Sequence, residues 1–292
     1  MTRKLFCEVE KASQQGQEFS VRGVLAKLGL SVSGYYDFHR RTPSKTELRR
    51  DLVMDKILEI YDKSNQIYGA PKIRRELLKE GIFVSERTVS DYMKKLNIHA
   101  CWVKKSVRTT INPDFSLKLR NILKQRFDPE KPNEIWCTDI TYIWTLEGFV
   151  YLTCIMELYS RKIIAWELSG SLESESVVRA IEKAISIRRC KPKIIHTDRG
   201  CQFVSASWIK ATEGIDKSYS KKAFPWDNAC IESFHSLIKR EWLSRFVIRN
   251  YGHARKLIFE YIDAFYNTER IHSHCGYTSP DKFEEQFAAK AS

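Results

Sequence analysis

The sequence lacks a long hydrophobic run, and this absence excludes two classes of protein. Its first residues, MTRKLFCEVEK, contain no apolar core of the kind that a secretory signal needs, so we expect none. The longest apolar stretch, around FVYLTCIMEL, is too short to span a bilayer. We therefore expect a cytoplasmic protein without a membrane partner.

Paired cysteine motifs are also missing. The eight cysteines are scattered, and no two of them are spaced as C-x-x-C. In a chain without a signal they are most simply reduced thiols. His272, His274 and Cys275 cluster near the C-terminus, but no second ligand pair with zinc-finger spacing accompanies them, so we expect no zinc site.

Acidic charge is scarce in the first part of the chain. Residues 1–130 carry 26 Lys and Arg against 16 Asp and Glu, or +10 of the total formal charge of +13. Residues 131–292 are nearly balanced, with 23 against 20. A basic excess of this kind favours a polyanion partner, most often nucleic acid, although it can also serve general solubility.

Two helical segments occupy the basic part. Residues 18–41 predict a helix–turn–helix, because apolar residues recur at helical spacing, Gly29 closes the first helix and Ser31 or Ser33 can cap the second. The expected apolar stripe is Val21, Val24, Leu25 and Leu28.

Residues 45–100 predict a second unit of this type. Its first helix carries Leu48, Leu52, Val53, Ile57 and Ile60. Pro71 begins the next helix and Gly81 follows its end, while Ser85 can cap a third. Such helices can enter a DNA major groove, whereas bundles that contact proteins would show the same periodicity. The charge favours DNA, and our candidates for phosphate contacts are Arg87, Lys94, Lys95, Lys104 and Lys105.

After DPEKPNE at 128–134 the pattern changes to mixed α/β. Three runs rich in Ile, Val, Tyr, Trp and Thr predict an antiparallel meander with turns at 147–148 and 160–162. Alternation places Ile135, Cys137, Asp139, Thr141 and Ile143 on one face of the first strand, and both of its faces look covered. A helix, the short strand KIIHT, another helix, an extended segment near 215–219 and a helix from about 228 follow.

Three acidic residues are the candidates for a catalytic site: Asp139 in IWCTDIT, Asp198 in IIHTDRG and Glu232 in WDNACIESF. An ionised Asp inside a covered strand is costly unless it is paired or bound to a metal. Asp198 ends a buried strand, where α/β sheets usually place their sites. Any one of the 36 acidic residues would be read as structural; the hypothesis of a site rests on the joint context. Carboxylates suit Mg²⁺, and two such ions can drive phosphodiester chemistry.

Four motifs, WCTDIT, HTDRGCQF, DNACIESFHSLIKRE and YNTERIHSHCGYTSPDKF, together resemble the D-D-E transposases of bacterial insertion sequences. The resemblance is to the second-frame product of two-frame elements, whose catalytic domain is similar to retroviral integrase. The upstream segments VLAKLGLSVSGYYDFHRR and YGAPKIRRELLKEG fit the helix–turn–helix segments of that family. Between Asp198 and Glu232 lie 33 residues, where the family typically has about 35.

The resemblance implies an α/β ribonuclease-H-like catalytic domain with a mixed five-stranded sheet, preceded by all-α helix–turn–helix modules. The domains expected are residues 1–44, 45–105, a linker at 106–128, and 129–292. Asp139, Asp198 and Glu232 would hold two Mg²⁺ ions, with Mn²⁺ as a substitute. Lys239, two helical turns beyond Glu232, would contact the end of the element, with Asn228 and Arg199 as further DNA contacts.

The implied activity is cleavage of an element end to a 3′-OH followed by strand transfer. Terminal inverted repeats and target DNA would be the partners of a homodimer or larger assembly, with a first-frame protein as a possible addition, in the bacterial cytoplasm at the nucleoid. Two alternatives stay open: a DNA-binding regulator without activity, and a ribonuclease-H-like nuclease that cuts without joining.

Overall fold

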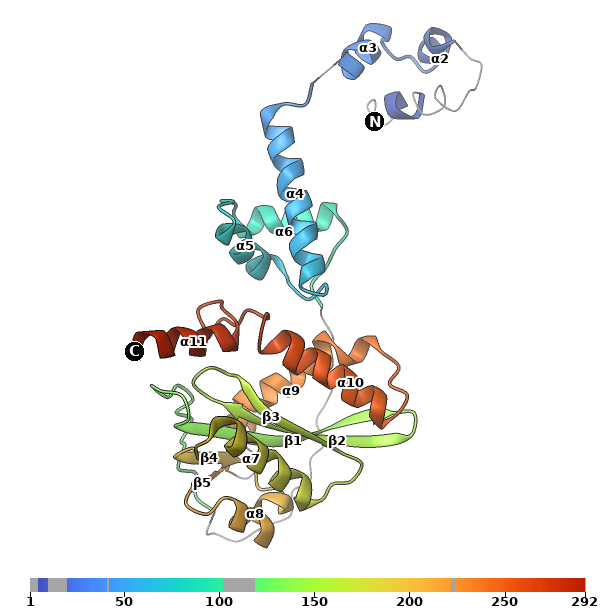
Figure 1. Cartoon of the computed structure of the whole chain (residues 1–292). Helices are drawn as coiled ribbons and strands as arrows, with labels where there is room; N and C mark the ends of the chain where they lie inside the picture. Colours follow the sequence, from blue (N-terminus) through green and yellow to red (C-terminus); the bar gives the residue numbers. More distant parts are fainter. Residues whose placement is uncertain (1–4, 10–19, 41, 102–118, 222–223, 292) are drawn as a thin grey trace. The chain divides into compact units, whose positions relative to one another are not determined.

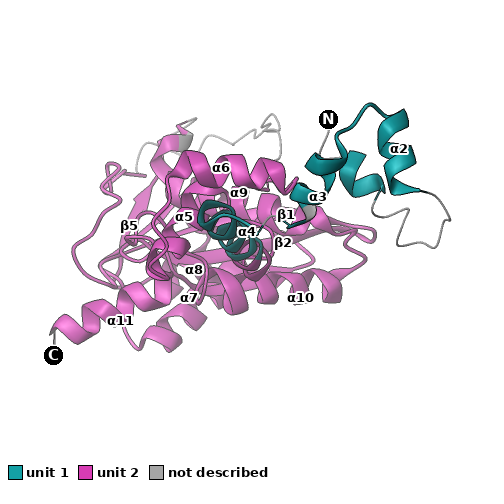
Figure 2. Ribbon diagram, turned by 90° about the horizontal axis from the view of Figure 1, so that it is seen from above, with its two compact units in different colours: residues 1–58 teal, residues 59–292 magenta. Residues whose placement is uncertain are grey.

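The computed structural model describes residues 5–9, 20–40, 42–101, 119–221 and 224–291. The chain divides into two compact units, residues 1–58 and 59–292, which Figure 2 shows in different colours. All eight cysteines are free thiols. None of the helices in the described ranges is both long enough and apolar enough to cross a membrane.

The first unit contains a small helical cluster. Helix α2 covers Val21–Lys27 and α3 covers Val32–Arg40. The hydroxyls of Ser20 and Ser31 accept bonds from the backbone N–H of Gly23 and Gly34, as N-caps do. The buried side chains are Phe6, Val9, Leu25 and Tyr35.

The prediction of buried apolar residues in these helices is wrong at some positions. Leu28 is 46% exposed, because α2 ends at Lys27 and Gly29, at φ +64°, turns the chain. Helix α4, Lys45–Lys63, begins in the first unit and ends in the second. Its Leu48 and Leu52 are more than half exposed, whereas Val53, Ile57 and Ile60 are buried, so only the later part of the helix carries a core face.

The second unit opens with the helices expected near Pro71 and Ser85. Helix α5 covers Ala70–Lys79 and α6 covers Glu86–Lys95. The Ser85 hydroxyl accepts from the Thr88 N–H at 3.0 Å and caps α6, while Gly81 at φ +76° supplies the turn after α5. Ile73, Leu77, Val89 and Met93 are the buried residues of the two helices.

A mixed five-stranded sheet confirms the predicted α/β order (Figure 1). The strands are β1 Ile135–Thr145, β2 Gly148–Glu157, β3 Ile163–Ser169, β4 Ile194–Thr197 and β5 Asp216–Tyr219. Their order is β3-β2-β1-β4-β5; β1, β2 and β3 form the antiparallel meander, and β4 and β5 add in parallel. Gly148, at φ +117°, occupies the hairpin turn, where a side chain would be strained.

Helices cover both faces of the sheet (Figure 1). Helices α7 and α8 pack on one face, where Trp136, Ile181, Ile195 and Trp208 are fully buried. Helices α9 and α10 contact β1 from the other face. The bounds of the helices are α7 Ser174–Arg188, α8 Ala206–Ala211, α9 Ala229–Glu241, α10 Tyr251–Tyr261 and α11 Pro280–Ala291. Short 3-10 helices cover Cys201–Val204, Pro225–Asn228 and Leu243–Arg245, and a π-helix covers Ile262–Tyr266.

One expectation for β1 is wrong. Both of its faces look covered from the sequence, yet Tyr142 is 62% and Trp144 61% exposed. The parallel pairing of β1 with β4 ends at Cys137, opposite His196, so the later part of β1 pairs only with β2. The end of the β1–β2 hairpin therefore projects beyond the shorter strands and keeps an open face.

A buried ion pair joins α9 to the segment after α10. The guanidinium of Arg270 donates to Glu241 at 2.7 and 2.6 Å, and both side chains are 6% exposed. The Tyr261 hydroxyl donates to the same carboxylate at 2.6 Å. Burial raises the pKa of Glu241, but the bonds from Arg270 outweigh it and hold the pKa below its ordinary value. The pair fixes the C-terminal end of the helix that carries Glu232.

Candidate active site

The strand register brings Asp139 and Asp198 to the same level of the sheet. Strands β1 and β4 are parallel neighbours, and Cys137 pairs with His196. Asp139 and Asp198 each lie two residues beyond this pair. Both residues are therefore located near the carboxyl end of β4, at the same level of the sheet. The side chain of Asp139 is 16% exposed.

Asp198 lies in a tight turn that leaves little room for a side chain at Gly200. The Gly200 N–H donates to Asp198 Oδ1 at 2.9 Å. A Cβ at Gly200 would lie 3.1 Å from that oxygen and 3.1 Å from Gln202 Oε1, so a larger residue would crowd the carboxylate. Behind it, the His196 ring lies between the hydroxyls of Ser218 and Ser220, at 2.9 and 3.1 Å. Burial lowers the pKa of His196 to about 4, so the ring is neutral near pH 7.

The pKa of Asp198 depends on the other two carboxylates. Burial, followed by the negative charges of Asp139 and Glu232, raises the pKa of Asp198 to about 7, against the bond from the Gly200 N–H. Like charges have this effect only at short range, so the three groups share one electrostatic site. A carboxyl that resists ionisation beside two others is typical of a functional site.

Glu232 reaches this region because α9 packs on β1. It lies in the first turn of α9, with Ile231, Phe234 and Ile238 buried beneath the helix. One turn later, His235 Nδ1 is 3.4 Å from Asp139 Oδ2. The imidazole is buried, and its Nε2 has no hydrogen-bond partner among the described residues. His235 therefore connects the helix of Glu232 directly to the strand of Asp139.

The segment before α9 is held by Asp227. Its carboxylate accepts from Asn121 Nδ2 at 2.6 Å, Gln125 Nε2 at 3.0 Å and the Lys221 N–H at 2.9 Å. Burial works against these bonds, but together they keep the pKa of Asp227 below its ordinary value. Asn228 is 4% exposed and donates to the Thr138 carbonyl at 3.4 Å, beside Asp139. Asn228 thus anchors the start of α9 to β1, and Asp227 ties the segment before it to Asn121, Gln125 and Lys221.

The basic residues named as candidate DNA contacts differ in their surroundings. Lys239 lies on α9 with its Nζ 4.5 Å from the centroid of the Tyr142 ring. Arg199 donates to the carbonyls of Ser220 and Leu119, at 2.8 and 3.3 Å, and so braces the turn after Asp198.

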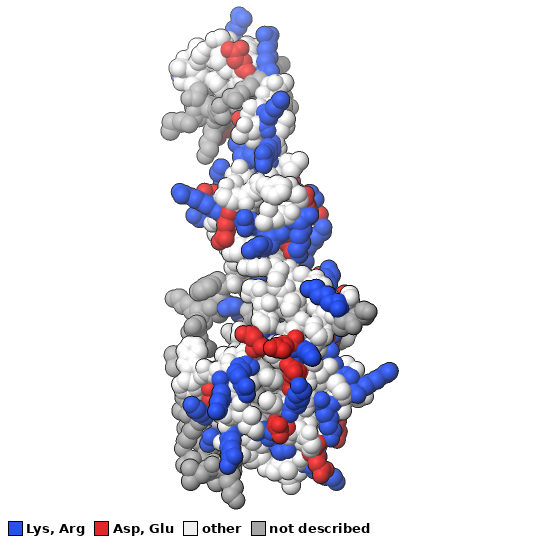
Figure 3. All heavy atoms as spheres, turned by 90° about the vertical axis from the view of Figure 1, so that its left-hand side faces the viewer, with Lys and Arg blue, Asp and Glu red and all other residues white. Residues whose placement is uncertain are grey.

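Arg87, Lys94 and Lys95 are exposed on α6, whereas Lys104 and Lys105 lie outside the described residues. The view in Figure 3 shows Lys and Arg side chains spread along the chain with Asp and Glu between them.

The sequence reasoning missed two contributors to this site. Nothing in the local pattern distinguishes His235 from Ser236 as the residue that meets Asp139, and nothing in it singles out Asp227 as the residue that holds the segment before α9. Within the described ranges, no three His, Cys, Asp or Glu side chains are positioned as a finished metal site. Three unneutralised carboxylates repel one another, and Asp198 Oδ1 accepts from Gly200 instead. As a donor set, three carboxylates still suit a hard cation.

Family models match three parts of the chain. An integrase core domain matches residues 129–224, an HTH-like domain matches residues 47–106, and a second integrase core model matches residues 213–280. The segment matched by the first model includes Asp139 and Asp198, and the segment 213–280 includes Glu232 and Lys239.

Relatives with similar sequences span nearly the whole chain. A transposase for insertion sequence element IS904 of Lactococcus lactis is 33% identical over 250 residues, which are 85% of this chain and 98% of that protein. Transposase InsF for insertion sequence IS3A of Escherichia coli is 33% identical over 277 residues, 92% of this chain and 95% of the relative. An uncharacterized 31 kDa protein of insertion element IS600 from Shigella sonnei is 32% identical, with 89% and 96% covered.

Among solved structures, the HTLV-2 integrase catalytic core domain in complex with magnesium is similar to this chain at 19% identity and a TM-score of 0.40. The match covers 52% of this chain and 96% of that one.

Proposed function

The chain belongs to the transposases of bacterial insertion sequences, with an integrase core and an HTH-like domain, and from this premise we propose that it cleaves and joins DNA through Asp139, Asp198 and Glu232. The observation that carries the proposal is the convergence of these side chains from β1, the end of β4 and the first turn of α9. Holding like charges close together is unfavourable to the folded state, and this favours a functional role for the three carboxylates.

The proposed cofactor is a pair of Mg²⁺ ions, replaceable by Mn²⁺. Asp139 would be the shared ligand, with Asp198 and Glu232 each holding one ion. The raised pKa of Asp198 supports this assignment, because burial and the two neighbouring carboxylates disfavour its charged form, and a cation would offset both effects. When bound, such ions activate the attacking oxygen and stabilise the leaving one.

The chain's own residues position these groups. His235 holds Asp139 from the side of α9, the Gly200 N–H holds Asp198, and the Arg270–Glu241 pair fixes the far end of α9. Phosphoryl transfer needs positioning and charge neutralisation more than covalent help from the protein. Asn228 and Arg199 serve mainly to brace this arrangement, since their side chains are engaged with backbone carbonyls.

Water would cut at the element end and leave a 3′-OH, which then attacks a second phosphodiester. Lys239, two turns along α9 from Glu232, would contact the DNA beside the scissile bond. Residues 47–106, with Arg87, Lys94 and Lys95 on α6, would bind the terminal inverted repeats. Two ends need two active sites, so a homodimer or larger assembly is proposed, with a first-frame element protein as a possible partner in the bacterial cytoplasm.

The test is cleavage and joining of a labelled element-end duplex with Mg²⁺ or Mn²⁺, comparing the wild type with Glu232→Gln. The amide keeps the shape of the side chain and removes its charge. We expect the wild type to cut and join, and the variant to bind DNA while its rate falls at least about a thousandfold. Equal rates of cutting would exclude Glu232 from the reaction, and two proteins that bind DNA without cutting it would indicate a DNA-binding regulator. A wild type that cuts, but leaves a pre-cut 3′-OH end unjoined, would be a nuclease.

A further inference from the structure

The projecting end of the β1–β2 hairpin carries an aromatic cluster that the proposed chemistry does not use. Tyr142 and Trp144 on β1 and Phe149 on β2 are 62%, 61% and 48% exposed. The Phe149 ring contacts Tyr142 edge-on at 5.6 Å and Trp144 at 4.8 Å between centroids. These three rings, called the aromatic platform here, are ordered by one another and yet open to solvent.

The platform is rigidly mounted. Trp144 and Phe149 are cross-strand partners in the β1–β2 register. At the hairpin tip the Thr145 hydroxyl donates to the Gly148 carbonyl at 2.8 Å, and the Leu146 N–H donates to the Ile248 carbonyl at 2.9 Å. The hairpin end is thereby tied to the chain after α9. Rings held in place lose little conformational freedom when they bind a ligand.

The aromatic platform lies next to the candidate active site. Tyr142 follows Asp139 by three residues on β1, about 10 Å along the strand, and by the alternation of the strand its side chain lies on the opposite face from that of Asp139. From the other side, Lys239 Nζ lies 4.5 Å from the Tyr142 ring, on the helix that carries Glu232. Strand and helix thus lead from two of the three carboxylates to the same ring.

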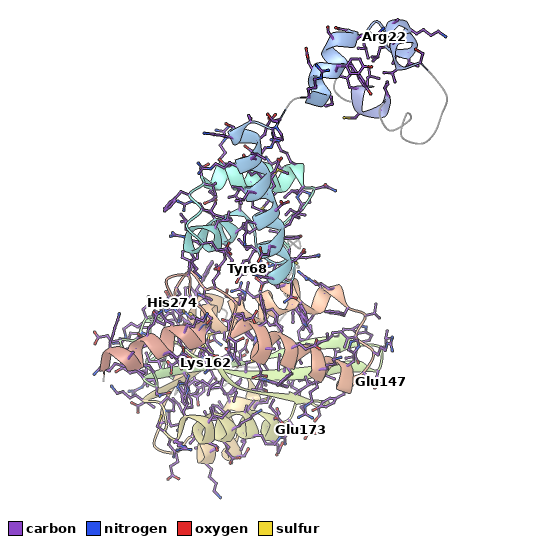
Figure 4. All side chains as sticks on the ribbon, turned by 45° about the horizontal axis from the view of Figure 1, so that its top comes forward. Arg22, Tyr68, Glu147, Lys162, Glu173 and His274 are labelled. Atoms are coloured by element: carbon purple, nitrogen blue, oxygen red, sulfur yellow. The ribbon has the colours of Figure 1, made fainter. Side chains whose placement is uncertain are left out.

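Charge around the platform suits a nucleic acid strand. Lys239 lies at its inner end, and Arg249 is exposed directly after Ile248, the residue that holds the hairpin tip. Glu147 is at the tip itself, and Figure 4 shows it at the end of the sheet. Aromatic rings interleaved with cations are how proteins hold unpaired bases: the rings stack on bases and the cations meet phosphates.

We propose that the aromatic platform stacks unpaired bases of the DNA strand that runs past the acidic trio. This inference rests on the proposed function and adds to it the form of the substrate, a DNA end that is frayed or single-stranded next to the scissile phosphate. Unstacking is cheapest at a duplex end, so the platform would favour ends over duplex interiors.

The experiment uses the full-length chain carrying Glu232→Gln, so that bound DNA stays uncut. The probes are two duplexes of one sequence, one blunt and one with a four-nucleotide unpaired extension containing 2-aminopurine, whose fluorescence falls on stacking. We expect tighter binding of the extended duplex, with quenching. Trp144→Ala should reduce that preference about tenfold, while Trp144→Phe, which keeps a ring, should retain most of it. Phe259→Ala, at a 55% exposed position on α10, is the matched control and should behave like the parent.

Unchanged preference and quenching in Trp144→Ala would overturn the platform. So would a Trp144→Ala chain that keeps its preference but elutes as a smaller species, since the rings would then be an interface between copies. The joining assay separates this inference from the proposed function. A wild type that joins ends without favouring the extended duplex refutes the platform alone. One that favours the extended duplex without joining refutes the transposase chemistry and leaves the platform standing.

Discussion

Replacing Asp198 by asparagine should stabilise the protein in the absence of divalent metal. The carboxyl of Asp198 has its pKa raised to about 7, first by burial and then by the charges of Asp139 and Glu232. Asparagine has no charge to bury, and its Oδ1 can still accept from the Gly200 N–H. A residue that the reaction needs would thus be one that the folded state tolerates poorly.

The sign and size of this change in the free energy of unfolding follow from the linkage between proton binding and folding. The folded pKa lies above the unfolded value of about 3.8, so the folded state binds the proton more tightly. The contribution of Asp198 to stability is fully present below about pH 4 and is lost as the pH rises through 7. The whole difference corresponds to about 4 kcal/mol at 1.36 kcal/mol per pH unit. Solvent screening and relaxation reduce it, so we expect Asp198→Asn to gain about 2 kcal/mol at pH 8, or about 4–8 °C in Tm.

Thermal unfolding in EDTA at pH 5 and pH 8 measures this effect. The gain should be largest at pH 8 and about 0.4 of that at pH 5, where the carboxyl is protonated in the folded protein but ionised in the unfolded chain. Asp216→Asn, which removes an exposed carboxylate on β5, is the control and should change stability by less than about 0.5 kcal/mol. Adding MgCl₂ should raise the Tm of the wild type more than that of Asp198→Asn. An Asp198→Asn protein that melts at or below the wild type at pH 8, or gains equally at both pH values, would refute the reasoning.

Two further predictions concern residues outside the acidic trio. Arg270→Ala should lower the free energy of unfolding by about 3–5 kcal/mol in a urea titration, because Glu241 stays buried without its partner. Arg179→Ala, which breaks a half-exposed pair with Glu167, should cost less than about 1 kcal/mol, and equal losses would contradict the argument. Arg87→Ala should weaken binding to all duplexes alike and reduce the slope of log affinity against log salt by about one. An unchanged slope would remove Arg87 from the DNA interface.

Much of the fold follows from local patterns. The three strands of the meander, the strand that precedes Asp198 and the helix that begins near Asn228 all have clear periodicity and turn residues. Ser85 and Gly81 occur where the helix boundaries need them. Asp139, Asp198 and Glu232 could be nominated from their combined contexts, because Asp139 lies inside a predicted strand, Asp198 follows the end of another strand and Glu232 lies in the first turn of a helix.

The sequence by itself determined which elements form and which residues carry charge on them, since helix and strand periodicities are properties of a few consecutive residues. Only the tertiary structure decided which side chains meet. The pairing of Cys137 with His196 aligns Asp139 with Asp198, and the packing of α9 selects His235 as the residue against Asp139. Strand lengths leave Tyr142 and Trp144 open at the hairpin end. Register and packing depend on contacts between residues far apart in the chain, which no local pattern encodes.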